Sequence, residues 1–155
     1  MRSVQIEDMC IFQNKYNLYD MFDYYNQIVF NNVIDKIDLE WVQRIEHARG
    51  NCCYRCLDGS IKINLSIEAL KSNNEYEVAN VLVHEMIHAL LFQLHVEMDI
   101  SHGPMWNMIA FQANSYFGLN ITEFGDLFDV ELQLRKDEDQ KQRVQNSFMG
   151  HGRML

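Results

Sequence analysis

The stretch Val81-Leu82-Val83-His84-Glu85-Met86-Ile87-His88-Ala89-Leu90-Leu91 decides how the rest of this 155-residue sequence is interpreted. It is an HExxH pattern inside a predicted helix. Because a helix turns about 100° per residue, His84 and His88 share one face about 6 Å apart along the axis, where two imidazoles can hold one zinc ion. Glu85 stands beside them and can accept a proton from a water at the metal without being a ligand itself.

The apolar surroundings of this pattern favour a metal site over a chance match. HExxH also occurs in unrelated proteins, where its polar side chains lie on the wet side of an ordinary helix. Here apolar residues surround almost the whole helix, so His84, Glu85 and His88 form a narrow polar strip. Buried polar groups need hydrogen-bond partners or a metal. The apolar residues are Val78, Val81, Leu82, Val83, Met86, Ile87, Leu90, Leu91 and Phe92.

A third ligand has to come from elsewhere, because a catalytic zinc ion takes three protein ligands and keeps a fourth position open. His95 follows on the same helical stripe, but it would lie about 10 Å beyond His88 and is better explained as a surface or helix-end residue. His102 remains. It precedes Gly103-Pro104, where a flexible glycine and a helix-starting proline can turn the chain back. We therefore expect His84, His88 and His102 to bind zinc.

Two other zinc-protease patterns do not match. The extended metzincin motif requires glycine at position 91 and histidine at position 94, where this chain has Leu91 and Leu94. A gluzincin takes a glutamate ligand from the following helix. No acidic residue lies between Asp99 and Glu123, so that helix has no glutamate to offer.

The remaining pattern predicts an α+β fold in which a small, mostly antiparallel sheet packs on the HExxH helix and its neighbouring helices. One strand alternates, with Ile37, Leu39 and Trp41 or the opposite set facing inward, and an Asp58-Gly59 turn joins the other two strands. The predicted elements are a helix over 16–30, strands over 37–42, 51–54 and 60–65, a short helix from 66, and helices over 75–94 and 104–118.

Composition fits one folded domain followed by a tail, at 48% hydrophobic and 23% charged residues. Aromatic and aliphatic residues thin out after Gly125, and a run of charged residues follows. We expect the folded domain over residues 1–125, a charged linker over 126–147 and a separate peptide over 148–155.

The net charge of −9 argues against strong DNA binding by this chain alone, because nucleic-acid binders normally present a basic face. No stretch approaches the roughly 18 apolar residues of a membrane span. The N-terminus carries Glu7 and Asp8 instead of an apolar leader. We therefore expect an intracellular, soluble protein without a membrane partner.

The four cysteines suit a reducing compartment, because three of them crowd into five positions and make a poor disulfide framework. Cys53 and Cys56 have the spacing of half a zinc finger. A second pair of ligands would have to come from Cys10 and His47. We expect the clustered cysteines to pack as small apolar side chains instead.

Several motifs together resemble the SprT-like zinc metalloprotease family, most closely its Spartan branch. The HExxH helix is followed by His102-Gly103-Pro104 and by an aromatic residue two positions later. The likeness covers about residues 18–125. Its further segments are 21–26 with Phe30, 39–41, 50–54, 61–66 and 120–122.

The resemblance implies a zincin-like metalloprotease core that cleaves proteins covalently trapped on DNA, in a DNA-stimulated way. It implies that His84, His88 and His102 bind zinc and that Glu85 is catalytic. It also implies a role in DNA repair in the nucleus, with the cytoplasm as a further compartment.

One departure from the Spartan pattern affects DNA binding. Spartan proteins usually follow the protease core with a small second zinc subdomain that binds DNA. Here no cysteine follows Cys56 and no histidine lies between His102 and His151. We expect that subdomain to be missing and DNA binding by this chain alone to be weak.

The segment Phe148-Met149-Gly150-His151-Gly152-Arg153-Met154-Leu155 resembles the SHP box, with which adaptors bind the hexameric unfoldase valosin-containing protein. Gly150 and Gly152 allow an extended backbone to lie close to a partner, while Phe148 and Leu155 supply apolar contacts. We expect this peptide to recruit the unfoldase.

These observations predict a zinc-dependent endopeptidase resembling Spartan, recruited through its C-terminal peptide. One alternative is an SprT-like adaptor that delivers cargo to valosin-containing protein and cuts little, although the intact Glu85 argues against it. Another is a regulatory protease that acts without DNA and trims substrates of the unfoldase. The acidic charge favours this second alternative.

Overall fold

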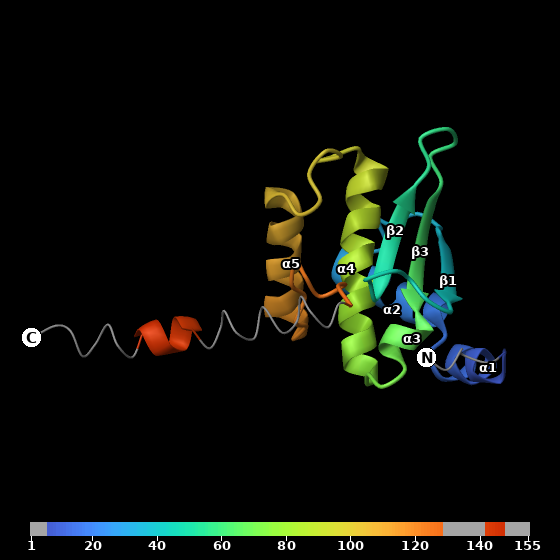
Figure 1. The fold of residues 1–155 in the computed structure, drawn as a ribbon. Helices are drawn as coiled ribbons and strands as arrows, with labels where there is room; N and C mark the ends of the chain where they lie inside the picture. The colour runs from blue at the N-terminus through green and yellow to red at the C-terminus, as the bar shows by residue number, and fades with distance from the viewer. Residues whose placement is uncertain (1–5, 129–141, 148–155) are drawn as a thin grey trace, which may run out of the picture.

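Helix α4 (Glu75–Leu94) occupies the middle of the computed structural model, with α5 (Pro104–Phe117) on one side and a three-stranded sheet on the other (Figure 1). The structure describes residues 6–128 and 142–147. The remaining elements are α1 (Ile6–Lys15), α2 (Leu18–Phe30), β1 (Asp38–Val42), β2 (Gly50–Tyr54), β3 (Ile61–Ser66) and α3 (Ile67–Leu70). The expected α+β class is confirmed.

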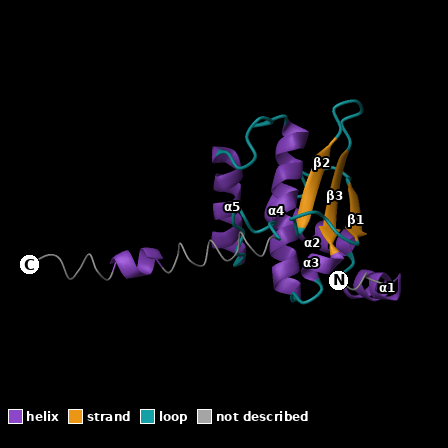
Figure 2. Cartoon of the chain, viewed as in Figure 1, coloured by secondary structure: helices purple, strands orange, loops and turns teal. Residues whose placement is uncertain are grey.

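The sheet has the order β1-β3-β2, and it is mixed, whereas the sequence predicted a mostly antiparallel one (Figure 2). β2 and β3 form the antiparallel hairpin around Asp58-Gly59, with Gly59 at φ 70°. β1 and β2 also run in opposite directions. β3, whose Ile63 and Leu65 are completely buried, inserts between them and therefore pairs with β1 in parallel.

Helix α4 is buried along most of its length because apolar residues surround it, as the sequence predicted. Its start is fixed by a capping box, in which the Asn74 side chain accepts from the Glu77 backbone N–H and the Glu77 carboxylate accepts from the Asn74 N–H. It packs on β2 and β3 with one side and on α5 with another. His84 and Glu85, the buried polar side chains of this helix, are consequently enclosed by two layers of the fold.

The helix α1 (Ile6–Lys15) was not predicted from the sequence. Of its described side chains, Met9 packs partly against the core, while Ile11 is 63% exposed. In the sequence, four apolar residues follow one another at positions 9–12 instead of recurring every three or four residues, so no one-sided apolar stripe marks this helix.

The folded part extends beyond Gly125, where the sequence places the end of the domain. The Arg49 N–H donates to the Asp126 carbonyl at 2.6 Å, and the Phe128 N–H donates to the His47 carbonyl at 3.0 Å. Ala48 and Leu127 form an antiparallel bridge between these bonds. Residues 126–128 therefore pair with residues 47–49, and the division into domain, linker and peptide stays a prediction.

All four cysteines are free thiols, and only Cys52 is half-buried as expected. Cys10, Cys53 and Cys56 are exposed, so the expectation that the cluster packs as apolar side chains is wrong for Cys53 and Cys56. In the described part of the chain, no cysteine belongs to a group that could hold a metal ion. Within the same residues, no helix is both long and apolar enough to cross a bilayer.

Truncation of the central strand should destabilise the fold. Ile63 is 0% exposed, and replacing it with alanine leaves a cavity, so Ile63→Ala should lower the free energy of unfolding by about 2–5 kcal/mol. Leu57 is 96% exposed, and Leu57→Ala is the matched control, expected to change stability by less than about 0.5 kcal/mol. Urea denaturation measures both, and equal effects would contradict the central position of β3.

Candidate metal centre

Three imidazole nitrogens converge at one point beside α4. The Nε2 atoms of His84 and His88 lie 3.3 Å apart, and each lies 3.2 Å from the Nε2 of His102. Two nitrogens that share a tetrahedral zinc ion at the usual bond length of about 2.05 Å lie about 3.3 Å apart. The donor set therefore fits one zinc ion with three histidine ligands, and the three residues selected from the sequence are brought together.

His102 reaches this cluster because the loop between α4 and α5 folds back tightly. His95 ends α4 in the left-handed conformation, so the helix-end position predicted for it is confirmed. Glu97 then accepts from the Met105 N–H at 3.0 Å and covers the start of α5. A Cβ at Gly103 would lie 2.6 Å from the Glu97 carboxylate, so glycine allows this close approach.

Trp106 forms a common wall behind the three imidazoles. Its ring centroid lies 4.8 Å from that of His84, 5.6 Å from that of His88 and 4.5 Å from that of His102. The side chain is 1% exposed. An indole in this position limits ring rotation and excludes water from one side of the cluster, which keeps the nitrogens directed toward one another.

The orientation of His84 is fixed from the opposite side by residues 120–122. Its Nδ1 donates to the Thr122 carbonyl at 2.9 Å, which leaves the lone pair on Nε2 free to bind a metal. The Asn114 side chain holds both backbone groups of Ile121, and Asn80 accepts from the Asn120 N–H. Residues 120–122 belong to the segments that resemble the family, and these contacts give them the physical role of orienting His84.

His84 and His88 are held in the neutral form. Burial, followed by the neighbouring His102, lowers the pKa of His84 from 6.5 to about 3. Burial, followed by His84 and His102, likewise lowers the pKa of His88 to about 3. Neutral imidazoles offer the lone pairs that metal binding requires.

Glu85 is buried beside the cluster, at 1% exposure. Burial raises the pKa of its carboxyl well above 4.5, and the adjacent Asp126 carboxylate raises it further. Its Oε1 atom has no hydrogen-bond partner among the described residues. A carboxyl group with a free oxygen next to three convergent imidazoles is suited to take up and release a proton.

Asp126 is the site residue that the sequence did not predict. Its Oδ1 lies 3.5 Å from Nε2 of His84, and one ligand atom from each of His84, Glu85 and Asp126 lies within 4.8 Å of the other two. Burial raises the pKa of the Asp126 carboxyl. The sequence had assigned residue 126 to the linker, and a lone aspartate after Gly125 carries no pattern that would have revealed its position.

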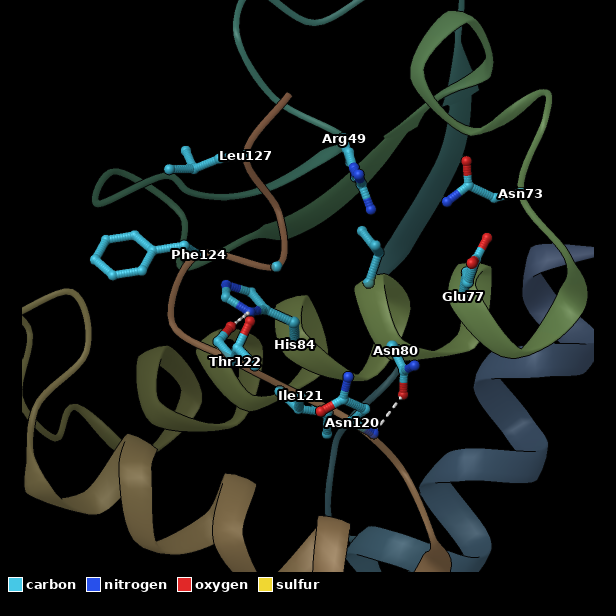
Figure 3. Close-up of a pocket in the computed structure, with 12 residues that line it drawn as sticks. Arg49, Asn73, Glu77, Asn80, His84, Asn120, Ile121, Thr122, Phe124 and Leu127 are labelled. Atoms are coloured by element: carbon cyan, nitrogen blue, oxygen red, sulfur yellow. Dashed lines mark hydrogen bonds between the residues drawn. The ribbon is translucent and has the colours of Figure 1, made fainter. Parts of the chain in front are cut away.

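Two cavities flank the segment that carries Asp126. One, of about 400 Å³, lies between Arg49, Glu77, Asn80 and His84 and is closed on one side by residues 120–127 (Figure 3). The other, of about 430 Å³, is lined by β2, by Glu85, His88 and Asp126, and by the loop over residues 96–101. His84 therefore lines one cavity and His88 lines the other.

The predicted partner-binding residues Phe148, Gly150, Gly152 and Leu155 lie outside the described residues. The structure therefore tests neither the SHP-like peptide nor its link to valosin-containing protein.

Residues 18–124 match the SprT-like family. The DNA-dependent metalloprotease SPRTN of Xenopus tropicalis is 32% identical over 117 residues, which cover 75% of this chain and 27% of that protein. Human SPRTN is 31% identical over 121 residues, covering 77% of this chain and 25% of that protein. The DNA-dependent metalloprotease dvc-1 of Caenorhabditis elegans is 27% identical over 138 residues, covering 86% of this chain and 36% of that protein.

Among solved structures, the metallopeptidase zymogen of Methanocaldococcus jannaschii jannalysin aligns with a TM-score of 0.45 and 14% identity, over 84% of this chain and 97% of that one. The chain spans about a quarter of the length of the two SPRTN relatives. Since the family match runs from α2 to the segment after α5 and includes the histidine cluster, this chain belongs to the SprT-like family.

Proposed function

We propose that this chain is a zinc-dependent endopeptidase in which His84, His88 and His102 bind the metal and Glu85 is the catalytic residue. The observation that carries the proposal is the convergence of three Nε2 atoms at 3.2–3.3 Å. That spacing suits a tetrahedral ion with one position left for water or substrate. The metalloprotease names of the SPRTN and dvc-1 relatives support the same activity.

The chemistry assigned to this chain centres on Glu85. Zinc bound at the cluster would supply Lewis acidity toward water and a peptide carbonyl. Glu85 would accept the proton of the attacking water and deliver it to the departing amine. Thr122 and Trp106 would keep His84 in the orientation that leaves its Nε2 lone pair available throughout.

We propose proteins crosslinked to DNA as the substrates, in DNA repair in the nucleus. The support is the DNA-dependent activity in the names of the SPRTN relatives, of which this chain spans about a quarter. The net charge of −9 favours one alternative, a regulatory protease that acts without DNA. Recruitment to valosin-containing protein through residues 148–155 belongs to the same proposal and rests on the sequence resemblance.

Replacement of Glu85 tests the enzyme and its substrate together. Glu85→Gln keeps the shape of the side chain but loses the base, so cleavage should fall by at least about 10²-fold while metal content is retained. The assay compares one protein crosslinked to single-stranded DNA with the same protein free of DNA. Cutting of the crosslinked form alone supports the DNA-dependent protease, and equal cutting of both supports the alternative.

No cutting of either form by the wild-type chain would contradict the protease and favour an adaptor. Equal cutting by wild type and Glu85→Gln would remove Glu85 from the mechanism.

Metal content tests the ligand set. The wild-type chain should contain about one zinc ion, and His102→Ala should lower the affinity for zinc by more than the 10- to 100-fold typical of losing a supporting hydrogen bond. His95→Asn is the matched control, because it removes an imidazole from the end of α4 and asparagine tolerates the left-handed backbone there. Mass spectrometry of the purified proteins measures zinc, and full retention in His102→Ala would point to another ligand.

The C-terminal peptide is tested by capture of purified valosin-containing protein. Phe148→Ala removes the first apolar contact of the SHP-like motif and should reduce capture to background. Val144→Ala is the control, because Val144 is an exposed apolar residue at 52% exposure in the same tail but outside the motif. Unchanged capture by Phe148→Ala would make the motif a coincidence.

A further inference from the structure

We propose that Asp126 is a fourth protein ligand of the metal centre, which closes the site until an extended substrate displaces residues 126–128. This inference rests on the proposed function, because it takes the histidine cluster as the metal site. It goes further in assigning a ligand from a segment that the sequence analysis placed in the linker.

The first observation is the position of the Asp126 carboxylate. Its Oδ1 lies 3.5 Å from the Nε2 of His84 and on the side of the cluster where Glu85 lies, since ligand atoms of all three groups fall within 4.8 Å of one another. Aspartate oxygens are common zinc ligands. Asp126 groups with His84 and Glu85, so its carboxylate would complete a four-ligand site after its side chain turns toward His88 and His102.

The second observation is the backbone of the same segment. Residues 126–128 run antiparallel to residues 47–49, through the bonds from the Arg49 N–H to the Asp126 carbonyl and from the Phe128 N–H to the His47 carbonyl. Residues 47–49 lead directly into β2, which is an edge strand of the sheet. An extended peptide that added itself to this edge would need the same backbone groups. Residues 126–128 thus occupy the backbone hydrogen-bonding groups of residues 47–49 that a bound peptide would need.

The third observation is that this segment separates two cavities. Gly125 and Leu127 line the cavity that contains Arg49 and His84 (Figure 3). Asp126 lines the other cavity, which contains Glu85 and His88. Each cavity holds about 400 Å³ or slightly more. Removal of residues 125–127 would join them into one groove past His84, Glu85 and His88. A groove that runs past these three residues could hold a peptide that extends on both sides of the scissile bond.

These observations favour a closing role over a catalytic one for Asp126. A zinc ion with four protein ligands is typical of structural sites, whereas a catalytic ion keeps one position open. Glu85 already supplies a carboxylate with an unpaired oxygen at the cluster. A second carboxylate, held by backbone pairing in the path of a substrate, competes with that substrate.

The test compares the wild-type chain with Asp126→Asn and Asp126→Ala, all as full-length proteins. Asparagine retains the shape of the side chain and the backbone pairing but is a weaker ligand, so it remains informative if alanine disturbs the fold. Asp23→Asn is the matched control, because Asp23 is exposed on α2 and lines neither cavity. Circular dichroism checks that each variant is folded.

Two measurements are made on each protein. Competition with a chelator gives the affinity for Zn²⁺, and cobalt substitution gives a visible spectrum that reports the number of ligands. Cleavage of an unfolded model protein, corrected with Glu85→Gln as the blank, gives the activity. We expect both Asp126 variants to bind zinc at least about tenfold more weakly, to change the cobalt spectrum, and to cleave at least about tenfold faster than the wild type.

Unchanged zinc affinity with an unchanged cobalt spectrum would overturn the proposal. So would cleavage below the wild-type level, because that result would make Asp126 part of the catalytic machinery or of the fold. If neither the wild type nor any variant cleaves the model protein, the result contradicts the proposed protease activity but not the assignment of Asp126 as a ligand. The zinc affinity and the cobalt spectrum still decide whether Asp126 is a ligand.

Discussion

The burial of polar side chains inside helix α4 is the constraint on which the rest of the structure depends. His84 and Glu85 are each 1% exposed, in a helix whose other faces pack on the sheet and on α5. Such groups destabilise a fold unless partners satisfy them. His84 is satisfied by the Thr122 carbonyl on one nitrogen and directs the other at the histidine cluster. The helix is therefore stable only together with segments that come much later in the chain.

Local hydrogen bonds hold those later segments in the positions that complete the histidine cluster. The Glu97 carboxylate accepts from the start of α5, and Gly103 has no side chain that would prevent this contact. The contact holds the loop so that His102 reaches the other two histidines. Asn114 holds the backbone of Ile121, which fixes Thr122 beside His84. The part of the chain after α4 thus completes a site that the helix begins.

The sequence predicted the features that depend on local pattern. The predicted helix over 75–94 agrees with the bounds of α4, and His102 followed from the exclusion of His95 by distance. The parallel pairing of β1 with β3 could not be predicted, because strand order depends on which strand inserts between the others. Asp126 could not be found either, because its place depends on three residues that pair with positions about eighty residues earlier in the chain.

The crowding of the three imidazole nitrogens has a consequence for the folding equilibrium. The folded chain holds three Nε2 atoms 3.2–3.3 Å from one another, an arrangement that the unfolded chain does not offer to an ion. An ion that binds this arrangement but not the unfolded chain shifts the equilibrium toward the folded state by mass action. Removal of an ion bound at the cluster would then lower the free energy of unfolding of the whole domain.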